Sequence, residues 1–243
     1  MHTLYTGFLL LALLAEIIGT VGGFGSSVFF VPLANFYFDF HTVLGITAVF
    51  HLASNVSKLA LFRHGLDGRL LRYIGVPSVV FVVVGGYLSG RVTGDWLALA
   101  LGAFLLLFAA LLLLTKYEVS PKPLPAVIGG TLSGFTAGLL GSGGAIRGVT
   151  MAAFNLEKSK FIATSAAIDL GVDAARTVVY YNNGYIGAEA YRHLPFLFVV
   201  GLLGTWVGKQ VLRKVPQSAF RTIALVLVLL IGAATLYTTL AEG

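Results

Sequence analysis

The sequence has no cysteine, and only 11% of its 243 residues are charged. The lack of cysteine excludes disulfides and thiolate metal sites. The low charge excludes a water-soluble domain of useful size, because such domains carry about 25% charged residues. The histidines also lack the spacing of metal ligands. They are scattered as His2, His41, His51, His64 and His193.

Sequence motifs of enzymes are missing as well. The chain has no His-Glu-x-x-His, no Gly-x-Ser-x-Gly and no phosphate-binding Walker loop. We therefore expect a protein that is not an enzyme and that uses no cofactor and no metal. The net charge of +6 comes from lysines and arginines in short loops between apolar runs. That placement is typical of membrane orientation, so we expect no nucleic-acid partner.

Apolar residues dominate the sequence: 57% are hydrophobic, and the mean hydropathy is +0.91. A helix needs about 20 apolar residues to cross a bilayer, and in lipid the backbone must satisfy its own hydrogen bonds. We therefore expect an all-α polytopic protein of the cell inner (cytoplasmic) membrane. The apolar runs are 4–36 and 124–154, both interrupted, and 42–62, 69–92, 96–115, 159–181, 190–212 and 217–240.

The order of these runs indicates a duplication. An offset of 119 residues (141 minus 22) matches glycines of the two halves over about a hundred residues without a gap. The matched pairs include Gly22 with Gly141, Gly25 with Gly144, Gly65 with Gly184 and Gly85 with Gly204. We expect a first membrane repeat at 1–115, a proline-rich linker at 116–125 and a second membrane repeat at 126–243.

A glycine-rich break interrupts the first apolar run of each half. The break at 22–27 reads Gly-Gly-Phe-Gly-Ser-Ser, and the break at 141–147 reads Gly-Ser-Gly-Gly-Ala-Ile-Arg. Broken helices that meet at mid-membrane expose backbone N–H groups, where the helix dipole favours an anion. Close helix packing on small residues would explain one such cluster. Two clusters at equivalent positions favour a binding site.

The loop charges discriminate between two topologies. If each interrupted run crosses the membrane once, the positive residues are divided between both sides. If each run enters and returns as a re-entrant hairpin, both termini lie outside and nearly all basic loop residues face the cytoplasm. These are Arg63, Arg69, Arg72, Lys116, Lys122, Lys158, Lys160, Arg213, Lys214 and Arg221. We therefore expect two inverted repeats, each a glycine-broken re-entrant hairpin followed by three transmembrane helices.

The two breaks, Pro32 after the first of them, and the segment 85–90 (Gly-Gly-Tyr-Leu-Ser-Gly) resemble the sulfite exporter TauE/SafE family of membrane proteins. The resemblance covers nearly the whole chain. It implies a carrier of small anionic sulfur compounds, such as sulfite or an organosulfonate. Two departures from the family pattern leave the substrate open. The first break is not a run of glycines, and the second half has Met151 at the position equivalent to Pro32 and adds Arg147.

Residues at the breaks are the candidates for substrate binding. Arg147 is the strongest, because a planar guanidinium can hold an oxyanion with two parallel hydrogen bonds. A structural pair with an acidic residue is the alternative for this arginine. The set expected to bind substrate is Gly25, Ser26, Ser27, Asn55, Ser142, Gly143, Gly144, Ala145 and Arg147.

Ionisable residues within other apolar runs form a second set, for coupling or ion pairing. Inserting such a group costs about 2.5–3.5 kcal/mol, so each is a functional candidate. Asp173 and Arg176 have the spacing of an ion pair on one helix face. Asp169 has no basic residue one turn away and is the better proton carrier. The set is His51, Asp169, Asp173 and Arg176.

Three polar residues of the first half allow simpler explanations. His51 fits an interhelical hydrogen bond better than a titrating role, and Lys58 fits snorkelling toward the membrane surface. Glu16 is expected either to pair with a base or to face water. For the helix face that carries Asp169, Asp173 and Arg176, the sequence supports an internal ion pair and a role in proton coupling equally.

We expect a secondary transporter of small anionic sulfur compounds that works by alternating access, with proton coupling left open. The alternatives are an anion channel and a carrier of another small organic anion. A membrane-embedded enzyme or assembly subunit would instead need a cluster of titratable residues reaching one face. The expected partners are a small anionic substrate and the lipid bilayer. The oligomeric state stays open, with a homodimer as one option.

Overall fold

The computed structural model describes residues 2–22, 25–62, 65–114, 119–214 and 217–242, and within these ranges it contains no strand. The first half forms α1 (His2–Gly22), α2 (Ser27–Ala34), α3 (Phe40–Leu61), α4 (Gly68–Leu70), the π-helical turn η1 (Leu71–Gly75), α5 (Val76–Ser89) and α6 (Gly94–Leu114). The second half forms α7 (Pro123–Leu140), α8 (Gly144–Ala152), α9 (Lys158–Asn182), α10 (Ala188–Leu212) and α11 (Gln217–Glu242). The expected all-α fold is confirmed.

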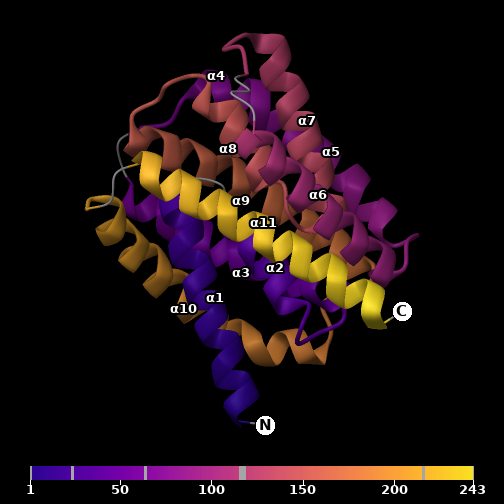
Figure 1. The fold of residues 1–243 in the computed structure, drawn as a ribbon. Coiled ribbons are helices and arrows are strands. Elements are labelled where there is room, and N and C mark those ends of the chain that lie inside the picture. Colours follow the sequence, from indigo (N-terminus) through magenta and orange to yellow (C-terminus); the bar gives the residue numbers. More distant parts are fainter. Residues whose placement is uncertain (1, 23–24, 63–64, 115–118, 215–216, 243) are drawn as a thin grey trace.

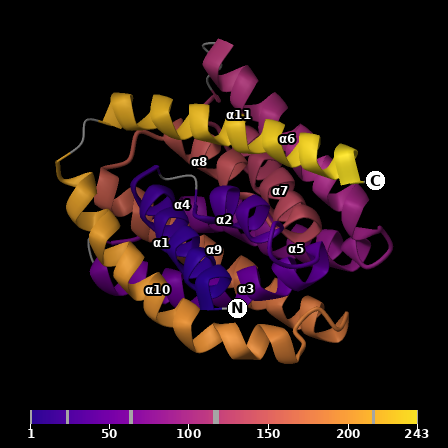
Figure 2. The same ribbon diagram turned by 60° about the horizontal axis from the view of Figure 1, so that its bottom comes forward.

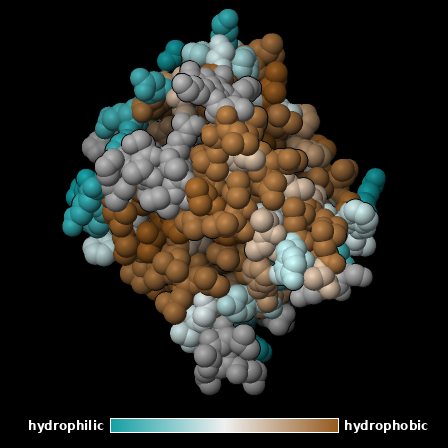
Figure 3. Space-filling view, in the orientation of Figure 1, coloured by the Kyte–Doolittle hydropathy of each residue, from teal (hydrophilic) through white to brown (hydrophobic). Residues whose placement is uncertain are grey.

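Five helical segments of the described chain are long and apolar enough to cross a membrane: Phe40–Leu61, Gly68–Ser89, Gly94–Leu114, Pro123–Leu140 and Tyr191–Leu212. Thr6–Gly22 and Leu225–Ala241 are shorter apolar helices. Apolar side chains cover the middle of the face drawn in Figure 3, and hydrophilic side chains gather toward its edges. A surface of this kind suits lipid rather than water. The chain is therefore a multi-pass membrane protein.

The break in the first half turns the chain back, so that α1 and α2 form an antiparallel hairpin. Near the tip, Gly19 packs against the backbone of Ser26 so closely that an added Cβ would collide with it. Farther from the tip, Phe8 of α1 packs on Phe30 of α2, with ring centroids 5.8 Å apart. Gly25 forms the turn with φ +80°, a conformation that favours glycine.

The break in the second half has the same consequence for α7 and α8. A Cβ added to Gly143 would collide with the carbonyl of Ser133, and one added to Gly129 would collide with Thr150. Gly141 ends α7 in the left-handed region, with φ +73°. The four contacting positions are ordered as in an antiparallel hairpin. α7 begins at Pro123, inside the segment 116–125 that we expected to be a linker.

α3 and α9 lie side by side at the centre of the molecule and run in opposite directions (Figure 1). His51 of α3 contacts Arg176 of α9, and Asn55, one turn later in α3, contacts Asp173, one turn earlier in α9. The polar faces of both helices therefore point at each other. This pair of helices supplies most of the charged side chains of the site described below.

The long arm of each hairpin packs in parallel against a helix of the opposite half. α7 packs on η1 and α5 through a stripe of small residues, as membrane helices do when their backbones approach closely. An added Cβ would collide with a backbone carbonyl at each of Gly130 (Ile74), Gly134 (Ser78) and Gly138 (Val82).

α1 packs on α10 in the same way. A Cβ added to Gly204 would lie 2.7 Å from Glu16, and one added to Gly208 would lie 2.8 Å from Thr20. The outer helices α6 and α11 pack on each other along one side of the molecule, and α10 lies on the opposite side (Figure 2). Each hairpin is thus held by the half to which it does not belong.

Candidate functional site

The tips of the two hairpins meet at a cavity of about 320 Å³, measured out to its open side. A Cβ added to Gly25 would lie 3.7 Å from Gly144 Cα and 3.5 Å from Arg147 Nη2. The first break therefore lies directly against the second. The cavity is lined by Gly25, Ser26, Ser27, His51, Asn55, Lys58, Ala137, Gly141, Gly143, Gly144, Arg147, Asp169, Val172, Asp173 and Arg176.

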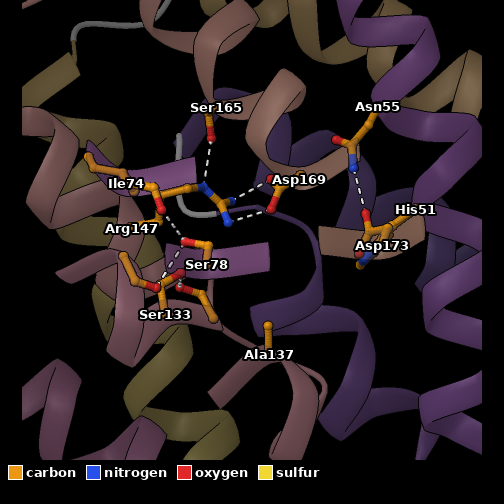
Figure 4. Close-up of polar contacts among 12 residues, drawn as sticks. His51, Asn55, Ile74, Ser78, Ser133, Ala137, Arg147, Ser165, Asp169 and Asp173 are labelled. Atoms are coloured by element: carbon orange, nitrogen blue, oxygen red, sulfur yellow. Dashed lines mark hydrogen bonds and ion pairs between the residues drawn. The ribbon is translucent and has the colours of Figure 1, made fainter. Parts of the chain in front are cut away.

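Arg147 projects from the first turns of α8 and forms a bidentate ion pair with Asp169 of α9 (Figure 4). Its Nε donates to Ser165 Oγ at 3.1 Å. The side chain of Arg147 is only 2% exposed, whereas that of Asp169 is 19% exposed. No basic residue lies one turn from Asp169 within α9, as the sequence indicates, and its basic partner comes from another helix. The acidic partner that we gave as the alternative for Arg147 is present.

Asp173 and Arg176 form the ion pair predicted from their spacing, with Arg176 Nη2 2.7 Å from Asp173 Oδ1. The other carboxylate oxygen accepts from Asn55 Nδ2 at 2.7 Å, as Figure 4 shows. Both charged groups are buried. A buried pair of this kind is more stable when its remaining hydrogen-bonding groups find partners. Asn55 supplies such a partner for Asp173, whereas Arg176 Nε has none.

Arg176 also caps the end of α7. Its Nη1 donates to the carbonyl of Gly141 at 2.9 Å and to that of Ala137 at 3.3 Å. Tyr180, one turn further along α9, donates to the carbonyl of Gly138 at 2.7 Å. The last carbonyls of a helix carry its partial negative charge. Arg176 and Tyr180 therefore stabilise the break that ends α7.

His51 connects Arg176 to the first hairpin. Arg176 Nη2 lies 3.2 Å from His51 Nδ1, and Ser26 Oγ lies 3.0 Å from His51 Nε2. A guanidinium can only donate, so Nδ1 accepts and the imidazole is neutral with its proton on Nε2. Ser26 in turn donates to Glu16 at 2.6 Å. The interhelical hydrogen bonding favoured for His51 is present.

Glu16 is fully buried and pairs with Lys58, whose Nζ lies 2.8 Å from the carboxylate. Lys58 itself is only 7% exposed. The expectation that it snorkels to the surface is therefore wrong, because its charge is neutralised inside the protein. Four hydroxyls also donate to Glu16: Ser26 at 2.6 Å, Ser54 at 2.5 Å, Thr205 at 3.1 Å and Thr20 at 3.2 Å.

The charges around the cavity balance. Three cations face three carboxylates in the pairs Lys58–Glu16, Arg147–Asp169 and Arg176–Asp173. The N-termini of α2 and α8 add partial positive charge, because the first N–H groups of a helix have no partner within it. The side chain of Ser26, the cap residue of α2, makes no hydrogen bond to these groups. Within the described residues no group of three His, Cys, Asp or Glu is placed to hold a metal ion.

A second cavity, of about 280 Å³ measured out to its open side, adjoins the first. Three residues line both: Gly25, Lys58 and Asp169. The second cavity extends toward the ends of α1 and α3 and the start of α9, where its walls include Thr20, Phe161, Ile162 and Ser165. Asp169 therefore stands where the two spaces join.

Asp67, just before α4, ties that loop to the start of α9. Its backbone N–H donates to Thr164 Oγ1 at 3.0 Å, and its carboxylate lies 3.6 Å from Lys160 Nζ. Burial would raise the pKa of the Asp67 carboxyl. The backbone N–H groups of Leu70 and Arg69, together with Lys160, outweigh this effect and lower the pKa from its ordinary value.

The structure gathers most of the predicted site residues around one cavity, and two of them lie elsewhere. Ser142 and Ala145 are buried but do not line it, and Ser142 Oγ has no hydrogen-bond partner. Sequence reasoning missed Lys58 as a lining residue and Glu16 as its partner. The signal for Lys58 was available, since His51, Ser54, Asn55 and Lys58 share a helix face, but the sequence does not link Lys58 to Glu16, which lies on another helix.

The family model of the sulfite exporter TauE/SafE family matches residues 8–235. No curated protein and no solved structure matches the chain significantly. The matched range contains the tips of both hairpins, the cavity between them and all three ion pairs around it. The chain therefore belongs to the sulfite exporter TauE/SafE family.

Proposed function

We propose that the protein is a secondary transporter of small anionic sulfur compounds, sulfite or an organosulfonate, in the cell inner membrane. The observation that carries this proposal is the position of Arg147 at the cavity where both broken helices begin. Membership of a family described as sulfite exporters supports the same substrate class.

The cavity offers three kinds of donor for an oxyanion. Arg147 supplies a guanidinium, which gives charge-assisted hydrogen bonds of about 1.5–3 kcal/mol. The first turns of α2 and α8 supply backbone N–H groups and a favourable dipole, of about 0.3–1 kcal/mol each and more when buried. Ser27 and Asn55 supply neutral donors from the cavity wall. A small tetrahedral or pyramidal oxyanion matches this set better than a large organic molecule does.

The helix directions support two inverted repeats. If each hairpin were a full span, it and the three further crossings of its half would return the chain to the side where that half began, and α3 and α9 would run in the same direction. They run antiparallel, as re-entrant hairpins require. The left-handed glycines Gly65 and Gly184, with φ +88° and +79°, occupy equivalent positions of the two halves and support the duplication. In this topology both termini lie outside and the basic loops face the cytoplasm.

Alternating access would move the two halves relative to each other around the cavity. The α1–α2 hairpin packs on α10 and the α7–α8 hairpin packs on η1 and α5, so each hairpin would travel with helices of the other half. The hairpin tips, including Gly25 and Gly144, would then move so that the cavity opens to one side of the membrane at a time.

A thermal-shift screen of the purified protein tests the proposal. The probes are sulfite, thiosulfate, sulfate, sulfoacetate, taurine and short carboxylates. A sulfur oxyanion should raise the unfolding temperature, because a ligand that binds the folded state stabilises it. Arg147→Gln should abolish that shift. Arg69→Gln should keep it, because Arg69 is exposed and lines neither cavity. A shift that survives Arg147→Gln removes Arg147 from the site.

A further inference from the structure

Asp169 occupies the place on Arg147 that a substrate anion needs. Its two carboxylate oxygens accept from Nη1 and Nη2 of the guanidinium. The remaining donor, Nε, is already bonded to Ser165. An oxyanion can therefore bind Arg147 bidentately only by displacing the Asp169 carboxylate. Binding of an anion to this guanidinium therefore requires that the Asp169 carboxylate leave it.

The charge balance of the cavity determines the free-energy cost of replacing Asp169 by an anion. With three cations paired to three carboxylates, an incoming anion makes the site negative. An uncompensated charge among largely buried side chains is unfavourable. A proton taken up together with the anion lowers this cost.

Asp169 is the carboxylate best placed to accept the proton. Glu16 keeps Lys58 and four hydroxyl donors, and Asp173 keeps Arg176 and Asn55, whether or not Arg147 changes partner. Asp169 alone among the three would lose both of its hydrogen bonds. It is also the most exposed of them and lines both cavities, so water can reach it.

Among the residues that the structure describes around the cavity, no cation is free to replace Arg147 as partner of Asp169. Lys58 and the neutral His51 face the cavity from α3, and Arg176 and Asp173 face it from α9. Lys58 is held by Glu16, and Arg176 is held by Asp173 and by the carbonyls at the end of α7. η1 and α5 present apolar contacts to α9 instead, such as Gly75 on Ile168.

We propose that Asp169 is the proton-binding site that couples anion binding to proton uptake. The anion displaces the carboxylate from Arg147, the freed carboxylate takes one proton from water in the cavity to become a carboxylic acid, and anion and proton leave the site together. Release of the anion returns the proton to water and restores the ion pair. This inference rests on the proposed anion site.

Proton uptake is measured by titration calorimetry of the purified protein in buffers of different ionisation heats, with thiosulfate as the probe. Thiosulfate keeps its charge near neutral pH, whereas sulfite itself would titrate. The wild type should take up about one proton per anion, and its affinity should fall by up to about tenfold per unit rise in pH. Asp169→Asn should bind thiosulfate with almost no proton uptake and little pH dependence.

Variants of the other carboxylates complete the test. Asp67→Asn, which lies outside both cavities, should keep the wild-type proton count. Retention of the proton by Asp169→Asn, with its loss in Asp173→Asn or Glu16→Gln, would overturn the assignment to Asp169. The infrared spectrum of the wild type should also gain the C=O stretch of a protonated carboxyl when thiosulfate binds.

The outcomes separate the two proposals. If thiosulfate, sulfate and sulfoacetate all fail to bind the wild type, the anion site itself is wrong. If thiosulfate binds the wild type with no proton uptake and no new carboxyl band, the anion site stands and the coupling through Asp169 is overturned. This second result needs no variant to fold.

Discussion

Arg176 Nη2 donates to His51 Nδ1 across 3.2 Å, and this contact joins the two halves of the chain. Because the guanidinium cannot accept, His51 must remain neutral and must donate through Nε2 to Ser26. A continuous set of hydrogen bonds therefore runs from Asp173 in α9, through Arg176, His51 and Ser26, to Glu16 in α1.

Glutamine at position 51 should preserve this connection, because its amide has one acceptor and one pair of donors. Leucine should break it and leave buried polar groups unpaired, at about 1–3 kcal/mol of unfolding free energy. Denaturation of the detergent-solubilised protein compares His51→Gln with His51→Leu. Equal losses in both variants would mean that His51 matters for packing rather than for hydrogen bonding.

The Glu16–Lys58 pair should behave as a unit. Lys58→Met leaves a fully buried carboxylate without its cation, and we expect a loss of about 3–5 kcal/mol. Glu16→Gln should cost a similar amount, and the double variant should lose clearly less than the sum of the two. Thermal unfolding of the four proteins gives the coupling. Additive losses would contradict the pairing, and Arg69→Met, at an exposed position, should change little.

Gly25 should be needed for two separable reasons, its backbone conformation and its place in the site. Gly25→Ala forces an L residue into the left-handed region, at about 1–2 kcal/mol, and adds a methyl group against Arg147 and Gly144. Gly65 has a similar φ but open space around it. Gly65→Ala should therefore cost stability alone, whereas Gly25→Ala should also weaken thiosulfate binding. Equal binding by the two variants would remove Gly25 from the site.

Gly134 tests the close packing of α7 on α5. A Cβ at this position would collide with the backbone of Ser78, so Gly134→Ala should push the helices apart and cost about 1–3 kcal/mol. Gly187 has open space and no left-handed φ, so Gly187→Ala serves as the control and should be neutral. Thermal unfolding distinguishes them. A neutral Gly134→Ala would contradict the helix contact.

The hairpin tips and most of the cavity wall could be predicted from the sequence, because their signals are local and repeated. A glycine-rich break marks each tip. The spacing of Asp173 and Arg176, about one helical turn, predicts their ion pair. His51 and Asn55 are also one helical turn apart, so they lie on one face of α3, and this face points toward α9.

Partners on different helices could not be predicted. Asp169 pairs with Arg147 of α8, and Lys58 pairs with Glu16 of α1, so neither partner lies within a turn in the sequence. The directions of side chains within an irregular turn were also out of reach. Ser142 and Ala145 belong to the second break, yet they lie off the cavity that their neighbours Gly141, Gly143 and Gly144 line.

Uptake of radiolabelled sulfite into proteoliposomes tests the central claim most directly. The wild type should show saturable uptake that is faster when the vesicles contain unlabelled sulfite. Arg147→Gln should reduce uptake at least about tenfold, as expected for the loss of charge-assisted hydrogen bonds, while Arg69→Gln should transport normally. Undiminished uptake by Arg147→Gln, or non-saturating flux through the wild type, would contradict a carrier whose anion site lies between the hairpin tips.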